Sequence, residues 1–203
     1  TFRQSDLKRL VANSSVSHMG FVLLGISSIG ATAGNLSPVG LTGAAMQMFS
    51  HGVVTGLLFV MVGVIYDKAH TRHIPDLGGL ATRMPIAAVA FMVAGLAALG
   101  LPGTSGFAAE IMIFLGTFPA HGVITALATI GVLLAAGYVL WMVQRTLFGP
   151  QRERWAHLTD VSAVEAVAPM LLMTAILIVG IYPAIVSDVF RAGVNDFFPR
   201  LIG

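Results

Sequence analysis

Apolar runs dominate the chain, and most of them are long enough to cross a membrane as helices. The runs cover residues 10–29, 41–66, 86–101, 105–118, 122–148 and 163–182. A hydrocarbon layer of about 30 Å needs about 20 helical residues at about 1.5 Å each. We therefore expect an all-α, polytopic transmembrane helix bundle with six crossings, in which the run that ends at residue 118 is short or part of a discontinuous helix.

The clearest interruption is the stretch Gly100-Leu101-Pro102-Gly103-Thr104-Ser105-Gly106. Pro102 cannot donate a backbone hydrogen bond, and Gly103 and Gly106 relax the restrictions on φ. One helix is predicted to end here and another to begin near Ser105. The new helix then carries Glu110 about one turn after its start.

Polar segments divide the chain and suggest its organisation. Residues 30–38 form a glycine-rich linker without charge, and residues 67–76 form the most polar connection. We expect about five membrane helices within 1–149, followed over 150–203 by an interfacial linker, a final transmembrane helix and an amphipathic tail at 188–200.

Basic residues do not orient the chain if it crosses six times. Those at 3–9 and 68–83 then share one side, while those at 145–154 lie on the other, so the positive-inside rule favours neither orientation. An alternative in which the Glu110 helix is re-entrant returns all of these residues to one side.

Composition agrees with a membrane protein and excludes several functions. Hydrophobic residues make up 56% of the chain, charged residues 10%, and the mean hydropathy is +0.87. A net charge of +2 without a basic stripe excludes nucleic acid as a partner. The chain has no cysteine, so thiolate metal sites and iron–sulfur clusters are excluded. It begins with Thr1 and lacks a signal-peptide pattern, so we expect the C-terminal portion of a longer protein.

Three ionisable residues fall inside the apolar runs: His18, His51 and Glu110. Such groups are costly in lipid and by default face a protein interior or a water-filled path, where they move protons or ions. Histidine titrates near neutral pH and can pass a proton through either ring nitrogen. Such a set can pass protons sideways through the membrane when waters and polar side chains bridge the gaps, and the candidate side chains are Ser14, Ser15, Ser17, Gln47, Ser50 and Tyr138.

Other interpretations of these residues remain open. The two histidines can be interhelical hydrogen-bond partners worth on the order of 1 kcal/mol each. Glu110 can be a headgroup-level residue at a helix start, where the helix dipole favours an anion. In the polar loop, His70-x-x-His73 beside Asp67 and Asp76 imitates a metal site, but solvated loop residues are the preferred interpretation and no metal is expected.

Several short motifs occur in a characteristic order. They are Asp6-Leu7-Lys8-Arg9-Leu10-Val11-Ala12-Asn13-Ser14-Ser15-Val16-Ser17-His18-Met19-Gly20, then Met46-Gln47-Met48-Phe49-Ser50-His51-Gly52, Tyr66-Asp67 with His70-Thr71-Arg72, Gly78-Gly79-Leu80, and Leu101 to Phe107 with Glu110. Together they resemble the antiporter-like membrane subunits of complex I-type NAD(P)H–quinone oxidoreductases, the type called NuoM or chain 4.

The resemblance implies a subunit with two inverted five-helix repeats, of which this chain holds the second repeat and the final helix. The family's acidic residue in the discontinuous helix matches Glu110, and its two channel histidines match His18 and His51. The glutamate and lysine pair of the first repeat would lie upstream of Thr1.

Function, partners and location follow from the same resemblance. It implies proton translocation driven by quinone reduction, with other membrane subunits, lipid and protons as partners, in a bacterial inner membrane or another energy-transducing membrane. NAD(P)H, flavin, iron–sulfur clusters and quinone would bind partner subunits, and no cofactor is expected in this chain. The alternatives are a subunit of a multi-subunit Na+/H+ antiporter and an inert membrane scaffold.

Overall fold

The computed structural model describes residues 1, 3–29, 38–150 and 152–202, with side chains described up to residue 196. The predicted linker at 30–38 therefore lies almost entirely outside the described residues. The described part is helical, with elements in the order α1 (Leu7–Ser27), α2 (Pro38–Ala69), η1 (Ile74–Asp76), η2 (Leu80–Thr82), α3 (Pro85–Ala98), α4 (Ser105–Leu147), η3 (Glu153–Trp155), α5 (Ala163–Ile181) and α6 (Ala184–Ile202).

Local signals account for where the helices begin. Asp6 caps α1, because its Oδ1 accepts a hydrogen bond of 3.0 Å from the Arg9 amide. Ser162 and Glu165 form a capping box at the start of α5. Pro85 occupies the first position of α3, where its missing N–H costs nothing.

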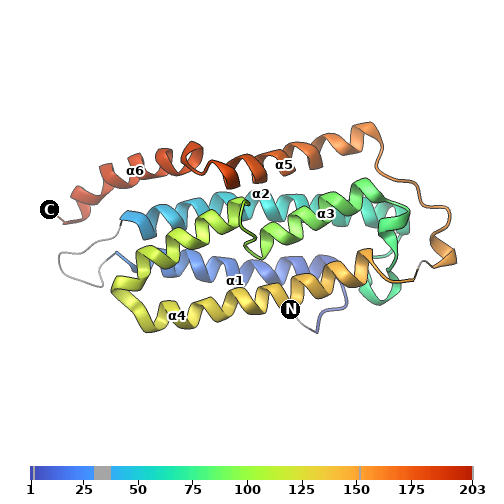
Figure 1. The fold of residues 1–203 in the computed structure, drawn as a ribbon, viewed down its shortest axis with the longest axis horizontal. Coiled ribbons are helices and arrows are strands. Elements are labelled where there is room, and N and C mark those ends of the chain that lie inside the picture. Colours follow the sequence, from blue (N-terminus) through green and yellow to red (C-terminus); the bar gives the residue numbers. More distant parts are fainter. Residues whose placement is uncertain (2, 30–37, 151, 203) are drawn as a thin grey trace.

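Four helices are individually long and apolar enough to cross a membrane: α1, α2, α4 and α5. With 14 residues, α3 is only about 21 Å long and does not cross alone. It is continued by the first part of α4, which runs on in the same direction to the far end of the bundle (Figure 1). Beyond Pro119, α4 bends at His121, whose backbone is not helical (φ −137°, ψ 48°), and its second part returns.

The expectation of six crossings is therefore wrong, because the runs at 86–101 and 105–118 form one discontinuous pass. The described residues cross the bundle as α1, as α2, as α3 with the first part of α4, as the second part of α4, and as α5 followed by α6 (Figure 1). The connection that follows α2 and the connection that follows α4 lie at the same end of the bundle. There the Gly79 amide donates a 3.1 Å hydrogen bond to the Phe148 carbonyl. The Glu110 helix is not re-entrant, yet the basic residues at 3–9, 68–83 and 145–154 do lie together.

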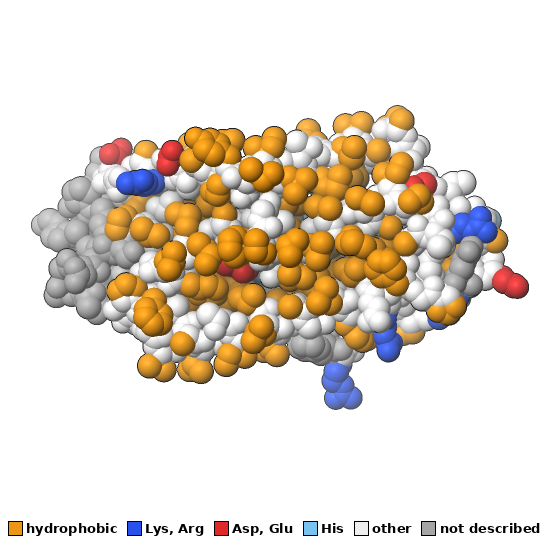
Figure 2. All heavy atoms as spheres, viewed as in Figure 1, with side chains coloured by type: hydrophobic (Ala, Val, Ile, Leu, Met, Phe, Trp, Pro, Cys, Tyr) orange, Lys and Arg blue, Asp and Glu red, His pale blue; other side chains and the backbone are white. Residues whose placement is uncertain are grey.

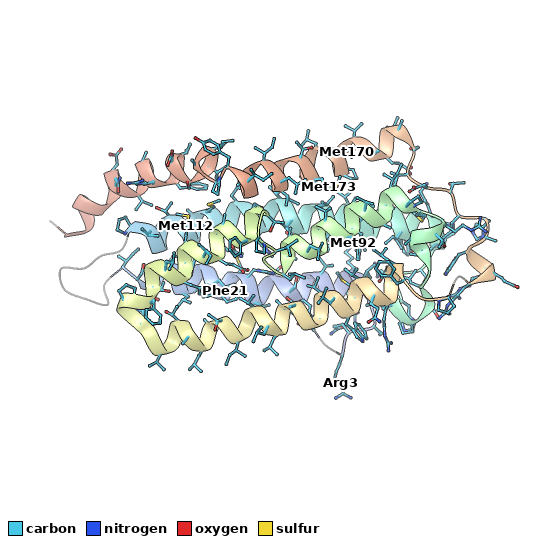
Figure 3. The ribbon with its side chains drawn as sticks, in the orientation of Figure 1. Arg3, Phe21, Met92, Met112, Met170 and Met173 are labelled. Carbon is cyan, nitrogen blue, oxygen red and sulfur yellow. The ribbon has the colours of Figure 1, made fainter. Side chains whose placement is uncertain are left out.

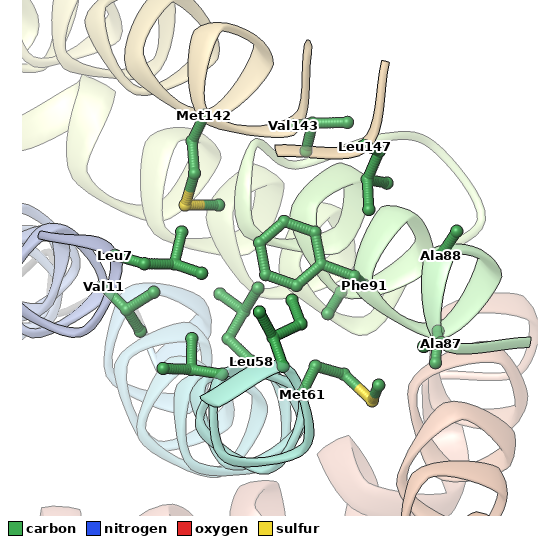
Figure 4. Packing of buried hydrophobic residues seen from close by; sticks show 14 of the residues in the cluster. Leu7, Val11, Leu58, Met61, Ala87, Ala88, Phe91, Met142, Val143 and Leu147 are labelled. Atoms are coloured by element: carbon green, nitrogen blue, oxygen red, sulfur yellow. The ribbon is translucent and has the colours of Figure 1, made fainter. Parts of the chain in front are cut away.

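A continuous apolar core holds the passes together. Phe91 of α3 is completely buried and lies among side chains of the neighbouring helices, including Leu7, Leu58, Met61 and Met142 (Figure 4). Methionines fill gaps at the edge of the core, where Met112 and Met173 pack from α4 and α5 (Figure 3).

The exterior is apolar as well. Hydrophobic side chains are spread over the whole length of the described face seen in Figure 2, and basic and acidic side chains gather mainly toward its ends. Large apolar residues that remain exposed include Leu23, Leu115, Leu133 and Leu171. A surface of this kind is suited to lipid rather than to water, and the chain is an integral, multi-pass membrane protein.

Helix α5, in the last pass, contacts the break between α3 and α4 in the third pass. A Cβ atom placed on Gly180 would lie 2.2 Å from the Gly103 carbonyl oxygen, so α5 and the break meet backbone to backbone. Just beyond this contact, α5 ends and α6 begins across Tyr182 and Pro183. Two interruptions of helical structure thus lie close together, one between α3 and α4 and one between α5 and α6.

Candidate functional site

The break between α3 and α4 positions the candidate site. Gly100 and Gly103 have φ values of +75° and +91°, which only glycine adopts easily. Thr104 closes the turn by donating from its hydroxyl to the Leu101 carbonyl at 2.7 Å. Gly106 lets the first turn of α4 approach the end of α3, since a Cβ there would lie 2.5 Å from the Ala97 carbonyl oxygen.

Glu110 lies in the first part of α4 and is only 5% exposed. Its Oε1 is 3.8 Å from Nδ1 of His18 on α1. Its Oε2 rests against Gly100, where an added Cβ would lie 2.5 Å away. Within the described residues, no Lys or Arg forms an ion pair with this carboxylate, so His18, when its ring is protonated, is the ionic partner of Glu110.

His18 lies at the centre of the cluster and is 4% exposed. Its Nδ1 is 3.3 Å from Nε2 of Gln47, and its ring centroid is 5.1 Å from that of His51. When Nδ1 is unprotonated it accepts from the Gln47 amide nitrogen, and the ring proton of neutral His18 then lies on Nε2. The Gln47 Oε1 is buried without a hydrogen-bond partner in the described part of the chain.

His51 extends the cluster toward the surface of the bundle. It is half-buried, and its Nε2 lies 3.0 Å from the Ser15 hydroxyl on α1. On the other side of the cluster, the Ser50 and Ser105 hydroxyls are 2.8 Å apart and join α2 to the first turn of α4.

A small cavity lies among these side chains. Its volume is about 10 Å³, and its walls include His18, Gln47, His51, Glu110 and Gly106. This is close to the smallest space that holds one water molecule. The cavity therefore joins both histidines and the carboxylate around a space of about the size of one water molecule.

The structure brings most of the predicted residues together but not all. The Ser14 hydroxyl is buried and donates to the Val11 carbonyl at 2.6 Å. Tyr138, on the second part of α4, is buried and interacts with Ser14 and electrostatically with Glu110. Ser17 is half-exposed and, within the described ranges, makes no side-chain hydrogen bond to the cluster.

Sequence reasoning missed two members of the site. The sequence around Ser105 predicts only the start of a helix, although its hydroxyl is 2.8 Å from that of Ser50, which lines the cavity. The contact of Gly100 with Glu110 has no sequence signal, because it depends on how the turn folds back.

The polar loop is separate from this site. His73 Nδ1 lies 3.0 Å from Asp76 Oδ2, and both side chains are exposed. In the ranges that the structure covers, no group of three or more His, Cys, Asp or Glu residues could hold a metal ion.

Comparison with known proteins assigns the chain clear relatives. A family model described as NADH:quinone oxidoreductase/Mrp antiporter, TM matches residues 1–135. NADH-quinone oxidoreductase subunit M from Rhodobacter capsulatus is 43% identical over 94% of this chain and 36% of its own length. NAD(P)H-quinone oxidoreductase chain 4 from Synechococcus sp. (strain CC9605) is 37% identical over 100% of this chain and 39% of its own length.

A solved structure of respiratory complex I from Thermus thermophilus with bound NADH contains a chain of the same fold. The TM-score is 0.87 with 31% sequence identity, over 100% of this chain and 41% of that one. The present chain thus spans about two fifths of the length of the relatives that it matches.

Proposed function

Because the chain belongs to the NADH:quinone oxidoreductase/Mrp antiporter transmembrane family, we propose that it translocates protons as part of a membrane subunit of a complex I-type NAD(P)H–quinone oxidoreductase. The observation that carries the proposal is the buried cluster in which His18, His51 and Glu110 meet beside a helix break. Redox chemistry, with NAD(P)H, flavin, iron–sulfur clusters and quinone, belongs to partner subunits.

In the proposed path, a proton enters at half-buried His51 and reaches Glu110 through His18. The two rings are in contact, but the 3.8 Å between His18 Nδ1 and Glu110 Oε1 is longer than a hydrogen bond. A single water in the adjacent cavity bridges that gap. Transfer from His18 to Glu110 therefore requires only one water, whereas transfer from His51 to His18 requires ring rotations that bring their nitrogens within hydrogen-bond distance.

Glu110 and His18 can share one proton at low cost. With the proton on Glu110 both groups are neutral, and with the proton on His18 they form an ion pair. Either arrangement leaves the pair without net charge, so the buried site never holds an isolated charge while the proton moves between them.

Gln47 can serve both arrangements. In the present orientation its amide N–H₂ donates to neutral His18. Rotation of the amide by half a turn places the unpartnered Oε1 at Nδ1, where it accepts from a protonated ring. The side chain thus follows the protonation state of His18 without moving its backbone.

The proposal is tested by Glu110→Gln in the full-length subunit of the assembled complex. Glutamine keeps the shape of the side chain but cannot exchange a proton, so we expect transfer through this subunit to slow about tenfold or more, or about 1.4 kcal/mol. The measurement is the number of protons moved per electron during quinone reduction in proteoliposomes. Glu153→Gln, at an exposed residue in η3, is the matched control.

An unchanged proton-to-electron ratio in Glu110→Gln, with the control also unchanged, would favour the inert scaffold. The same vesicles separate the proposal from the antiporter alternative. Proton movement that requires a sodium gradient and continues without quinone reduction would support a Na+/H+ antiporter instead.

A further inference from the structure

A groove between the start of α1 and the last turns of α2 combines positive charge with an apolar floor. Its volume is about 560 Å³, and it is lined by Lys8, Phe59, Val62, Gly63, Tyr66 and Arg72. None of these residues belongs to the Glu110 cluster.

The apolar part of the groove follows the helix axis. Phe59, Gly63 and Tyr66 lie about one turn apart on α2 and extend over about 10 Å. Gly63 keeps the middle of this trough open, since a Cβ placed on it would meet no atom within 4 Å. Phe59 and Tyr66 are 36% and 47% exposed, so the trough is also accessible from the side.

The charged part lies at the end of the trough. Lys8 is exposed and has no ion-pair partner in the described part of the chain. The guanidinium of Arg72 is 5.7 Å from the centre of the Tyr66 ring, and its Nε donates to Asp6 Oδ2 at 2.8 Å.

Asp6 is the acidic group that faces this mouth. Burial alone would raise its pKa, but the hydrogen bond from the Arg9 amide and the charge of Arg72 outweigh burial and lower it. The Asp6 carboxylate therefore bonds only the Nε edge of Arg72, while the Lys8 ammonium has no ion-pair partner among the described residues. The mouth of the groove keeps an excess of positive charge.

The order of these features along the bundle matches an amphiphile. The cations lie at the end where most basic residues gather, and the apolar trough runs from there toward the middle of the membrane. We propose that the groove binds an anionic phospholipid, with the phosphate between Lys8 and Arg72 and an acyl chain along Phe59, Gly63 and Tyr66. A free phosphate ion would use the mouth alone and leave the trough without a function.

The test uses the complete complex in phosphatidylcholine vesicles that contain a minor fraction of phosphatidylglycerol with a photoactivatable acyl chain. After illumination, mass spectrometry locates the cross-linked peptide. Cross-links are expected on α2 around residues 59–66, and unlabelled phosphatidylglycerol is expected to compete better than phosphatidylcholine or inorganic phosphate.

Two matched pairs of variants separate a specific site from general adhesion. Gly63→Leu fills the trough, whereas Gly20→Leu adds the same side chain at another open glycine outside it. Lys8→Gln removes one cation from the mouth, and Arg9→Gln removes its neighbour, which does not line the groove. Cross-linking is expected to fall about fivefold in Lys8→Gln and to be lost in Gly63→Leu, with little change in the controls.

Equal losses in the control variants would overturn the proposal. So would equal competition by phosphatidylcholine, or a cross-link from residues 59–66 to a neighbouring protein segment in place of lipid.

Discussion

At the scale of single residues, Glu110 is held between a histidine and a glycine. His18 provides its ionic partner, and Gly100 provides the space for its second oxygen. Gly100 is therefore required twice, once for its positive φ and once because a side chain would occupy the position of the carboxylate.

Gly100→Ala is expected to displace the Glu110 carboxylate and to lower proton transfer without removing any titratable group. Gly103→Ala is the matched control, because its φ is also positive but an added Cβ meets no atom within 4 Å. Both variants carry the backbone strain of about 1–2 kcal/mol. Only Gly100→Ala should lower the proton-to-electron ratio, and equal effects of the two would show that strain alone is responsible.

The sequence indicated the residues of the cluster better than their contacts. His18, His51 and Glu110 were recognisable because ionisable groups are costly inside apolar runs. The hydrogen bond between Ser50 and Ser105 and the contact of the Glu110 carboxylate with Gly100 depend on how the end of α3 and the start of α4 pack past each other. Polarity alone makes Ser17 a candidate, although it lies on a more exposed part of the α1 surface than buried His18.

At the scale of elements, the first turn of α3 is capped from far along the chain. The Asp160 carboxylate accepts from the Ile86 and Ala87 amides at 2.7 and 3.2 Å and also from the Val161 amide at 2.7 Å. The carbonyl of Asp160 accepts from the Lys68 ammonium at the end of α2 at 3.1 Å. One short segment thus joins α2, α3 and the start of α5.

Asp160→Ala is expected to loosen this end of α3, because at least two helix amides lose their acceptor. The expected cost is about 1–2 kcal/mol, typical of a lost N-cap. Hydrogen exchange of the Ile86 and Ala87 amides should quicken accordingly. Asp160→Asn, which keeps one acceptor oxygen, should have a smaller effect, and unchanged exchange in the alanine variant would contradict the cap.

The break was predictable at the element scale, but its consequence for topology was not. Pro102 and the neighbouring glycines indicate that a helix ends, whereas run length cannot tell whether the next run continues the pass or starts another. Core contacts decide this, and they place α3 and the first part of α4 end to end (Figure 1).

At the scale of the whole molecule, five passes collect the basic residues at one end. Nine of the eleven Lys and Arg residues lie within 1–9, 68–83 and 145–154, which the structure places together. The positive-inside rule then predicts an orientation with this end on the cytoplasmic side.

Cysteine labelling tests the orientation, since the chain has no cysteine of its own. Glu153→Cys lies at the basic end, and Asn195→Cys lies on α6 toward the other end. A membrane-impermeant maleimide should label Asn195→Cys in intact cells and Glu153→Cys in inverted vesicles. The reverse pattern would invert the topology, and detergent-solubilised complex, in which both sites should react, is the control.

The position of the break halfway along the third pass also has an electrical consequence (Figure 1). A charge that crosses a whole membrane experiences about 2.3 kcal/mol for every 100 mV or so of potential. A proton that stops at Glu110 has crossed about half of that field. In the proposed path, the arrival of the proton at Glu110 and its departure therefore each cross about half of the membrane potential. A change in membrane potential should alter the rates of both steps rather than of one alone.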